Sequence, residues 1–484
     1  MDTRHGEFAE NLGAPFLRDG APESTSPEGM PEDGVADTAR MTHIADTFLA
    51  KAGSGQMVVA VIGLGYVGLP LSEAYVRAGT RVVGFDVNAK RVAQLNAGQS
   101  GMRHIDDARV ASMRESGLFE ATTDAAVLAD ADALLICVPT PLDRYHHPDL
   151  SYVEATCEML KGHLREGHIV ILESTTYPGT TQEVMRPILE TSGLKAGADF
   201  ALAYSPERED PGNIDFETST IPKLVGADSE PERRMAEAVY SGIVDTVTVP
   251  NTRTAEAAKL TENIFRWVNI GLVNELKLVF EAMDIDVWEV IDAAASKPFG
   301  FMAFYPGPGV GGHCIRVDPY YLTWKAREHG MSTRFIELAG EVNIFMPRRV
   351  VNRLMEELNQ RHQKALASCR VLVCGVAYKK NIDDMRESPS LEVLKLLEDA
   401  GAEVDFYDPF IPEMGVSHDY PDFEGRKSIA WDPEVLATYD AVVITTPHTP
   451  VDYAVLAECV PLVVDTRNMT RDLPAHLQSK IAKA

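Results

Sequence analysis

A cysteine in the second half of the chain is predicted to lie on a glycine-rich loop. Four glycines stand among residues 307–312, and His313 and Cys314 come directly after them. A thiolate is a nucleophile that can add to a carbonyl carbon, and glycines let backbone amides come close to a ligand. The alternative is structural, because a lone cysteine commonly packs as a small hydrophobic side chain. The other motifs of the chain decide between these two interpretations.

Lys259 and Asn263 are a second pair of polar residues that could do chemistry. They lie within residues 254–295, where apolar residues recur at helical spacing. The apolar residues of this pattern are Ala255, Ala258, Leu260, Ile264, Val268 and Leu272. Because they are four positions apart, Lys259 and Asn263 share one face of the predicted helix. Such a pair commonly faces solvent, but apolar neighbours on several sides are compatible with burial at a domain or subunit boundary.

A strand, a glycine-rich turn, a helix and a second strand follow one another near the start of the folded chain. Residues 57–62 are an apolar run typical of a strand buried in a parallel sheet. Residues 69–78 have a helical pattern that ends at Gly79. Residues 81–85 form the next predicted strand, and Asp86 follows it. This order is typical of a dinucleotide-binding unit.

The three glycines of the turn have separate expected tasks. Gly63 permits the turn, Gly65 lets the backbone meet a pyrophosphate, and Gly68 lets helix and strand pack closely. Asp86 can accept hydrogen bonds from the adenosine ribose and would repel a 2′-phosphate, which favours NAD over NADP. Arg91 is near enough in sequence to keep NADP open as an alternative. The residues expected to contact the cofactor are Gly63, Gly65, Tyr66, Val67, Gly68, Asp86, Arg91, Pro139, Thr140 and Thr175.

Further patterns predict two α/β halves. In the first half, strands at residues 133–138 and 169–173 lead into Pro139, Thr140 and Thr175, at the sheet edge where ligands of open α/β folds bind. In the second half, strands are expected at residues 370–378, 404–409 and 441–445, with a helix at 391–400. The predicted fold class is therefore α/β, with two Rossmann-like doubly wound domains joined by a central helical region.

The expected domain ranges follow from these patterns. Residues 1–55 are expected to be a mostly disordered acidic extension, with a short helix near 42–51. The NAD-binding domain is expected at 56–250, the central helical domain with the catalytic loop at 251–350, and the second α/β domain at 351–484. Residues 1–40 mix Gly, Pro, Ser and acidic residues with few large apolar ones, so they cannot bury enough surface to offset their ordering entropy.

The composition excludes several classes of partner. A net charge of -27 over 484 residues argues against nucleic acid and anionic membrane surfaces as partners. No apolar stretch is long enough to span a bilayer. The six cysteines are scattered without CxxC pairs, so neither a metal site nor a secreted disulfide framework is expected. Cys137 lies within a predicted strand and is expected to be inert core. These observations together predict a cytoplasmic protein.

Six motifs occur in order along the chain. They are VIGLGYVGLP (61–70), VPTP (138–141), SPER (205–208), KLTEN (259–263), GGHC (311–314) and DMRESP (384–389). In these motifs the chain resembles the UDP-glucose/GDP-mannose dehydrogenase family over nearly everything after residue 56. Residues 173–179, 205–213 and 305–309 look most like the bacterial UDP-N-acetylglucosamine 6-dehydrogenase branch. Enzymes that act on UDP-glucose and UDP-N-acetylmannosamine are close relatives.

The resemblance implies a four-electron oxidation in polysaccharide biosynthesis by a homodimer. The C6 hydroxymethyl of a UDP-sugar, bound by the second α/β domain at 351–484, would become a carboxylate while two NAD+ are reduced. Cys314 would add to the C6 aldehyde, the thiohemiacetal would yield a second hydride, and water would hydrolyse the resulting thioester. Carbonyl chemistry supports the covalent step, since an aldehyde has no second hydride to give until a nucleophile adds to it.

The same resemblance implies roles for further residues. Lys259 and Asn263 would stabilise the C6 oxyanion, Asp318 and Thr175 would position water or transfer a proton, and Glu207 would act as a base or orient water in thioester hydrolysis. Asp318 could instead be a loop cap, and Glu207 a surface acid. Substrate contacts are expected from Glu207, Lys259, Asn263, Gly309, Gly311, Gly312, Lys379, Arg386 and Arg467, of which the last three would face the diphosphate.

One departure and two alternative functions stay open. Arg316 stands where proline is common two residues after the cysteine, so the resemblance leaves its effect on the loop undecided. A two-electron hydroxyacid dehydrogenase would share the first domain and a catalytic lysine but would need no thiol. A non-catalytic nucleotide-sugar sensor would use the same two sheets for binding alone.

Overall fold

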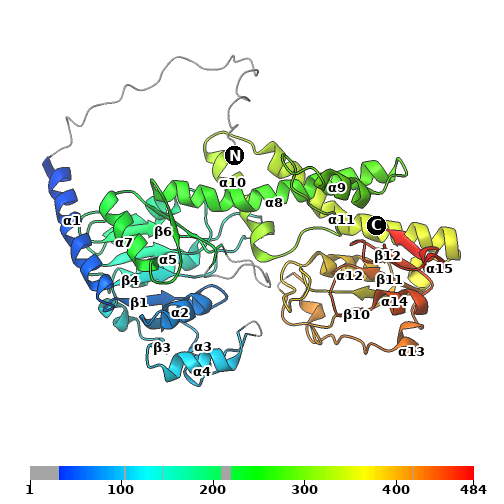
Figure 1. The fold of residues 1–484 in the computed structure, drawn as a ribbon, viewed down its shortest axis with the longest axis horizontal. Helices are drawn as coiled ribbons and strands as arrows, with labels where there is room; N and C mark the ends of the chain where they lie inside the picture. Colours follow the sequence, from blue (N-terminus) through cyan, green and yellow to red (C-terminus); the bar gives the residue numbers. More distant parts are fainter. Residues whose placement is uncertain (1–31, 103–104, 144, 209–219, 418) are drawn as a thin grey trace, which may run out of the picture.

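The computed structural model describes residues 32–102, 105–143, 145–208, 220–417 and 419–484. It contains two α/β domains, and the long helix α8 (Thr252–Glu281) runs from the first domain toward the second (Figure 1). The predicted class, two Rossmann-like domains joined by helices, is confirmed. Most of the predicted acidic extension lies outside the described residues, as do residues 209–213 of the motif that follows SPER.

The first domain is built on an eight-stranded sheet in the order β3-β2-β1-β4-β5-β6-β7-β8. The strands are β1 (Val58–Ile62), β2 (Arg81–Phe85), β3 (Phe119–Thr122), β4 (Ala133–Ile136), β5 (Ile169–Leu172), β6 (Ala201–Tyr204), β7 (Lys223–Ala227) and β8 (Thr246–Val249). The strands from β3 to β6 are parallel, whereas β7 is antiparallel to β6 and parallel to β8. The order reverses between β1 and β4, and ligands of such sheets bind beyond the carboxyl ends of the strands at this point.

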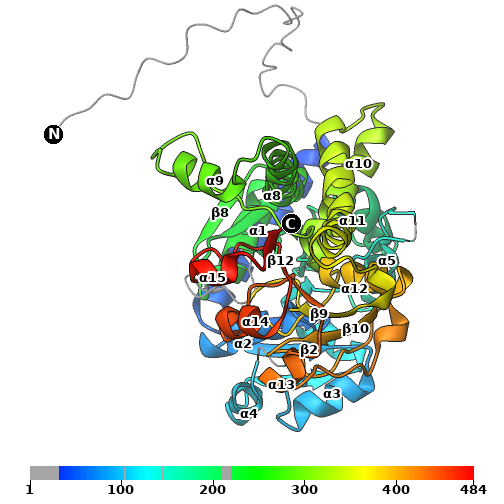
Figure 2. The same ribbon diagram turned by 90° about the vertical axis from the view of Figure 1, so that its right-hand side faces the viewer.

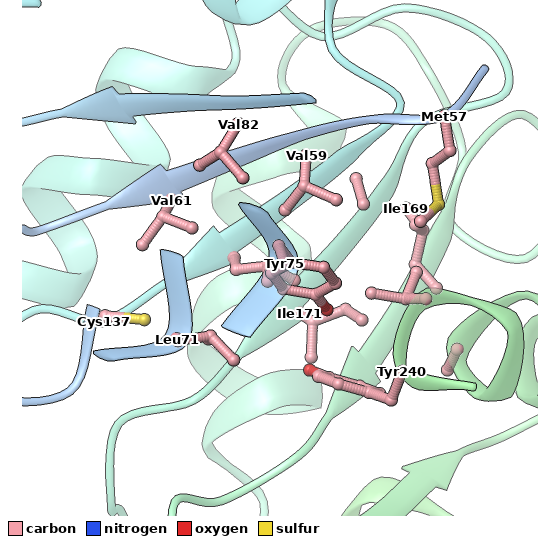
Figure 3. Packing of buried hydrophobic residues seen from close by; sticks show 14 of the residues in the cluster. Met57, Val59, Val61, Leu71, Tyr75, Val82, Cys137, Ile169, Ile171 and Tyr240 are labelled. Carbon is pink, nitrogen blue, oxygen red and sulfur yellow. The ribbon is translucent and has the colours of Figure 1, made fainter. Parts of the chain in front are cut away.

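Helices cover both faces of this sheet. They are α1 (Glu32–Gly53), α2 (Gly68–Arg77), α3 (Ala89–Asn96), α4 (Asp107–Glu115), η1 (Ala125–Asp130), α5 (Ser151–Leu160), η2 (Thr181–Met185), α6 (Arg186–Glu190) and α7 (Glu230–Tyr240). Side chains from α1, α2, α4 and α7 form one core, and side chains from α5, η1, η2 and α6 form a second core on the other face. Figure 3 shows part of the first core, including Tyr75, Tyr240 and Cys137. Cys137 is buried, as predicted, and burial raises the pKa of its thiol well above the ordinary value.

The helix α1 is longer than the short helix predicted for residues 42–51. Met41, Ile44 and Phe48 recur at helical spacing and are buried in the first core. The helix lies beside α7 along the edge of the first domain (Figure 1). Residues 32–53 therefore pack as part of the first domain, although the sequence division placed them in the extension.

Three more helices follow α8. They are α9 (Val287–Ala295), α10 (His313–Glu328) and α11 (Arg334–His362). The helical stretch predicted for residues 254–295 is thus two helices, and the Asp286 side chain caps the second by accepting from the backbone N–H groups of Trp288 and Glu289. The predicted boundary at 350/351 falls inside α11, which continues into the second domain.

Cys314 does not lie in a loop. The glycine-rich segment ends at Gly312, which has a φ of 92°, and α10 begins at His313. Cys314 is therefore the second residue of a helix, one helical turn before Asp318. The sequence favoured a loop because four glycines precede the cysteine, whereas α10 continues through Pro319.

The second domain has a parallel five-stranded sheet in the order β10-β9-β11-β12-β13. The strands are β9 (Arg370–Cys374), β10 (Glu403–Tyr407), β11 (Ala441–Ile444), β12 (Val463–Asp465) and β13 (Ile481–Lys483). The helical segments are η3 (Leu366–Ser368), α12 (Pro389–Asp399), η4 (Pro421–Phe423), α13 (Pro433–Leu436), α14 (Tyr453–Cys459) and α15 (Ala475–Gln478). Figure 2 shows this domain from the side, with α12 near the end of α11. Within the described part of the chain, no helix is both long and apolar enough to cross a membrane.

Candidate active site

The glycine turn after β1 has the geometry of a dinucleotide site. Gly63 has a φ of 94°, and a Cβ there would lie 2.6 Å from the carbonyl oxygen of Cys137. A Cβ at Gly68 would lie 1.9 Å from the carbonyl oxygen of Gly63. A Cβ at Gly65 would meet no atom within 4 Å, so the space in front of this residue is open to a ligand. The first and third glycines therefore serve packing, and the second faces open space.

The helix that follows this turn adds a favourable electrostatic field. The N-cap of α2 is Val67, which makes no side-chain hydrogen bond, and the first turn of α2 contains no acidic residue. The partial positive charge of the helix N-terminus is therefore not neutralised by the helix's own side chains, and it would attract a pyrophosphate. The residues present fit an NAD pyrophosphate.

Asp86 and Arg91 hold the other side of the same turn. The Asp86 carboxylate accepts from the Leu64 N–H at 2.9 Å and from the Asn88 N–H at 2.8 Å. Arg91 Nε donates to the Leu64 carbonyl oxygen at 3.1 Å, and its guanidinium also donates to the Ser100 carbonyl oxygen. Burial lowers the pKa of Arg91, although Asp86 opposes that shift. Both residues thus brace the turn from the carboxyl end of β2.

Arg386 of the second domain reaches the same turn. Its guanidinium carbon lies 4.1 Å from the ring centroid of Tyr66, an arrangement in which a cation faces an aromatic ring. Arg386 also forms an ion pair with Asp384, with the nearest nitrogen and oxygen 2.7 Å apart. The sequence placed Arg386 among the substrate contacts, whereas this geometry places it beside the predicted cofactor residue Tyr66.

The loops after β4 and β5 are joined at the carboxyl edge of the sheet. The Thr140 hydroxyl donates to the carbonyl oxygen of Thr175 at 2.8 Å. The Thr140 carbonyl oxygen accepts from the hydroxyl of Tyr321, on α10, at 2.8 Å. The Ser174 hydroxyl donates to the carbonyl oxygen of Val138 at 2.6 Å. The predicted cofactor residues Thr140 and Thr175 therefore lie together, next to α10.

Lys259, Asn263, Asp318 and Glu207 come together where α8, α10 and the loop after β6 meet. Lys259 Nζ donates to the backbone carbonyl oxygen of Glu207 at 2.6 Å. The Asn263 amide donates to the Asp318 carboxylate, and Arg266 donates to the Asn263 side-chain oxygen. Lys259, Asn263 and Asp318 are each at most 6% exposed. The pair on α8 thus faces protein rather than solvent.

Burial is the main influence on the Asp318 carboxyl. It raises the pKa of Asp318 to about 6, although the charge of Lys259 and the hydrogen bond from Asn263 act in the opposite direction. A carboxyl of this pKa changes its protonation state close to neutral pH and is suited to proton transfer. Cys314 precedes Asp318 by one turn of α10, so the backbone brings residue 314 into the same region.

The glycine-rich segment before Cys314 packs closely against the second domain. A Cβ at Gly311 would lie 2.8 Å from Tyr378 Cβ, and one at Gly312 would lie 2.9 Å from the Tyr378 ring. A Cβ at Gly307 would lie 2.3 Å from the guanidinium of Arg467. Burial lowers the pKa of Arg467 to about 10, and Asp465 opposes that shift. The glycines therefore allow close approach between the two parts of the chain, and they bring the segment to the predicted phosphate cation Arg467.

The remaining predicted cation and the atypical arginine also lie at this junction. Lys379 is partly buried and follows Tyr378, which touches Gly311 and Gly312. Arg316 on α10 forms an ion pair with Glu387 of the DMRESP motif, with nitrogen and oxygen 3.3 Å apart. The arginine that replaces the common proline therefore connects the helix of Cys314 with the second domain.

Lys223 and Glu173 were missed by sequence reasoning. Lys223 Nζ lies 2.7 Å from a Glu173 carboxylate oxygen and 3.3 Å from a Glu207 carboxylate oxygen. Glu173 is the last residue of a predicted strand and could have been noticed, but no local pattern marks Lys223 as its partner. Among the described residues, no group of three or more His, Cys, Asp or Glu side chains is arranged to hold a metal ion.

Three models of one protein family match successive parts of the chain. The NAD binding domain of the UDP-glucose/GDP-mannose dehydrogenase family matches residues 57–244, the central domain matches 253–344, and the UDP binding domain matches 372–472. A UDP-N-acetyl-D-glucosamine 6-dehydrogenase of Pseudomonas aeruginosa is 36% identical over 394 residues, which cover 81% of this chain and 90% of the relative. The chain belongs to the UDP-glucose/GDP-mannose dehydrogenase family. It is an NAD-dependent oxidoreductase that acts on a UDP-sugar.

The relatives of this chain are named for different substrates. A UDP-N-acetyl-D-mannosamine dehydrogenase of Pyrococcus horikoshii is 33% identical over 428 residues, covering 86% of this chain and 97% of the relative. The solved structure of the Pyrococcus horikoshii UDP-D-ManNAc dehydrogenase has a TM-score of 0.79 at 32% identity and covers 88% of this chain and 99% of that one. A UDP-glucose dehydrogenase structure from Pyrobaculum islandicum has a TM-score of 0.74 at 28% identity, with coverage of 86% and 96%.

Two alanine substitutions separate packing from cofactor binding in the glycine turn. Gly65→Ala is expected to keep the melting temperature of the free protein but to weaken NAD binding about tenfold or more, because its methyl group enters space that is open in the protein. Gly68→Ala, the matched control, is expected to lower the melting temperature because its Cβ would overlap backbone. Thermal unfolding and NAD titration measure the two effects. Unchanged NAD affinity in a folded Gly65→Ala protein would contradict this assignment.

Proposed function

We propose that this protein catalyses the NAD-dependent four-electron oxidation of the C6 hydroxymethyl of a UDP-hexose, through a covalent intermediate on Cys314. The observation that carries this proposal is the buried cluster of Lys259, Asn263 and Asp318 one turn from Cys314 on α10. An ordinary alcohol oxidation needs a hydride acceptor and a base. A cysteine beside such a cluster supplies in addition the nucleophile that an aldehyde requires before a second oxidation.

The first oxidation converts the C6 alcohol to an aldehyde. NAD+, when bound, supplies the acceptor for the hydride that leaves C6. The ammonium of Lys259 and the amide of Asn263 stabilise negative charge on the C6 oxygen, and their burial strengthens that interaction. Asp318 and Thr175 orient water or move the proton of the hydroxyl, since the pKa of Asp318 is raised to about 6 by burial.

The second oxidation and the hydrolysis need the thiol. The sulfur of Cys314 bonds to C6 of the aldehyde, whose oxygen takes up a proton. The thiohemiacetal then gives up its hydride to a second NAD+ and its hydroxyl proton to solvent, which leaves a thioester. Water adds to the thioester carbonyl and passes one proton to Glu207, and the C–S bond breaks to release the thiolate and a carboxylic acid, which ionises to the carboxylate. Residue 314 lies in the first turn of α10, where the helix N-terminus favours an anion.

The nucleotide half of the substrate is assigned to the second domain and the glycine-rich segment. Arg467 packs against Gly307, and Lys379 follows Tyr378 at the opposite end of the segment. Fixed cations at these points suit a diphosphate. Gly309, Gly311 and Gly312 are assigned to the sugar side, where their amides are near the start of α10. Arg386 is assigned to the cofactor side because of its contact with Tyr66.

UDP-N-acetylglucosamine is the proposed substrate, and UDP-N-acetylglucosaminuronate the product. Support comes from residues 173–179 and 305–309, together with the 36% identity to the Pseudomonas aeruginosa enzyme. UDP-N-acetylmannosamine and UDP-glucose are the alternatives, since relatives named for both share the fold. The pathway assignment to polysaccharide biosynthesis and the cytoplasmic location are part of the same proposal.

A homodimer is proposed as the working assembly. Phe265, Leu272 and Val279 recur every seven residues on α8 and are 41–50% exposed. Phe335 and Leu338 on the neighbouring helix α11 are 80% and 52% exposed. Apolar residues at this spacing form a stripe, and a second copy of the chain would cover it.

The stoichiometry of cofactor reduction tests the proposed reaction. We expect two NADH for each UDP-N-acetylglucosamine consumed, and faster turnover than with UDP-N-acetylmannosamine or UDP-glucose. Cys314→Ala should lose steady turnover, because the aldehyde then has no nucleophile. Absorbance at the NADH band and separation of the UDP-sugars measure both quantities.

Each alternative function has a distinct outcome in that experiment. One NADH per sugar, with normal turnover of Cys314→Ala, would favour a two-electron dehydrogenase. Binding of all three UDP-sugars without any NADH would favour a sensor. Faster turnover of UDP-N-acetylmannosamine or UDP-glucose would support the proposed reaction but would change the assigned substrate.

A charge in the apolar stripe tests the assembly. Leu272→Glu is expected to convert the dimer to a monomer, because burying an unpaired carboxylate in an apolar interface is costly. Val416→Glu, at an exposed apolar residue of the second domain, is the matched control and should stay dimeric. Light scattering coupled to size-exclusion chromatography gives the masses. A wild-type monomer, or a dimeric Leu272→Glu, would exclude this stripe as the interface.

A further inference from the structure

A buried lysine lies directly behind the loop that carries Glu207. Lys223 is the first residue of β7, and its side chain is 5% exposed. Its ammonium lies 2.7 Å from a Glu173 carboxylate oxygen, 3.3 Å from a Glu207 carboxylate oxygen and 3.4 Å from the carbonyl oxygen of Pro206. The Glu173 side chain is fully buried, whereas that of Glu207 is 18% exposed. One cation therefore joins a fully buried carboxylate to a carboxylate that is partly exposed.

The reversed direction of β7 explains why a lysine reaches this place. Because β7 is antiparallel to β6, its first residue lies at the edge where β5 and β6 end. The register pairs Tyr204 with Gly226, and continuing it places Lys223 opposite Glu207. Glu173 follows β5 directly, so its carboxylate arrives at the same edge. The sheet itself thus sets the arrangement of the three side chains.

Lys223 is charged in this setting. Burial alone would lower its pKa, but the carboxylates of Glu173 and Glu207 outweigh that influence and raise the pKa above the ordinary value. The hydroxyl of Tyr240 donates to the other Glu173 oxygen, which holds this carboxylate in place. Figure 3 shows Tyr240 in the first core, next to Ile171.

A second lysine holds the same loop from the other side. Lys259 Nζ on α8 donates to the backbone carbonyl oxygen of Glu207 at 2.6 Å. The Glu207 side chain also accepts from the N–H of Arg208 at 2.8 Å. The loop is therefore fixed between the proposed oxyanion lysine and Lys223. Among the described residues, the titratable and charged groups near the Glu207 loop include Cys137, Glu173, Arg208, Lys223, Tyr240, Lys259, Glu262 and Asp318.

We propose that Lys223, anchored by Glu173, is a positioning residue that keeps the Glu207 carboxylate ionised and oriented toward the thioester during hydrolysis. This inference rests on the proposed function, in which Glu207 takes the proton of the attacking water. Lys223 touches neither substrate nor cofactor in this account and forms no bond. A purely structural ion pair would stabilise the sheet edge without changing the pH dependence of hydrolysis.

Two substitutions that are expected to shift the pH dependence of hydrolysis in opposite directions test the proposal. Lys223→Met removes an attractive charge, so the ionised form of Glu207 becomes less favourable and the acid limb of the hydrolysis rate moves to higher pH. Glu173→Gln removes a repelling charge and leaves the ammonium, so the limb moves to lower pH. Lys223→Arg should keep the wild-type profile. Lys195→Met, at an exposed lysine paired with Asp37, is the matched control and should change nothing.

The two stages of the reaction are measured separately in stopped flow. Both NADH form before hydrolysis, so a burst reports oxidation and the steady rate reports hydrolysis. For Lys223→Met we expect a burst of wild-type amplitude and a steady rate at pH 7 that is about tenfold or more lower. Equal losses in burst and steady rate with an unmoved pH profile, or shifts of the same sign in Lys223→Met and Glu173→Gln, would overturn the proposal.

The controls separate this inference from the proposed function. If wild-type enzyme does not release two NADH per sugar, the proposed function fails, and the Lys223 proposal fails with it. If wild type releases two NADH but the variants behave as a structural pair would, the Lys223 proposal fails alone. If Lys223→Met does not fold, Glu173→Gln and Lys223→Arg still decide the question, because a wild-type profile in Glu173→Gln would contradict the proposed electrostatic coupling.

Discussion

The arrangement of this enzyme depends on three buried polar side chains between α8 and α10. Asp318 and Lys259 carry opposite charges in a region where isolated charges are unstable, and Asn263 donates to the Asp318 carboxylate. Removing one partner of the Asn263–Asp318 hydrogen bond would leave a buried polar group unsatisfied, which typically costs about 1–3 kcal/mol. The two helices are therefore held in one relative position, and that position puts residue 314 one turn from Asp318.

The contact between α8 and α10 also brings parts of both α/β domains together. Lys259 also holds the backbone of Glu207, so α8 fixes the end of β6 relative to α10. From the other direction, the segment before α10 lies against the second domain, where only glycine fits at Gly311 and Gly312 beside Tyr378. Arg386 reaches back to Tyr66 of the NAD turn. The residues that we propose to contact cofactor, sugar and nucleotide thus come from three family domains and meet at one set of loops.

The sequence predicted those features whose causes are local. The spacing of Gly63, Gly65 and Gly68 after a strand requires a specific turn, and the four-residue spacing of Lys259 and Asn263 requires a shared helix face. Both predictions agree with the structure, and the family comparison confirms NAD. The α/β class was equally accessible, because strand and helix periods alternate along the chain.

The features that sequence reasoning missed have non-local or conflicting causes. Lys223 meets Glu207 only because β7 runs antiparallel to β6, and nothing in the residues near Lys223 encodes that pairing. Cys314 was predicted in a loop because a glycine-rich run precedes it, yet contacts of α10 with α8 stabilise a helix that begins at His313. Arg386 was assigned to the substrate because a cation suits any phosphate, and only the interdomain contact relates it to Tyr66.

We propose that one cluster carries out both oxidations, with residue 314 as the nucleophile. Mass spectrometry of peptides from acid-quenched single turnovers, with Glu207→Gln used to slow hydrolysis, tests it most directly. The account predicts a UDP-hexuronyl adduct on the peptide that contains Cys314. An adduct on another cysteine, or none after two NADH have formed, would contradict it.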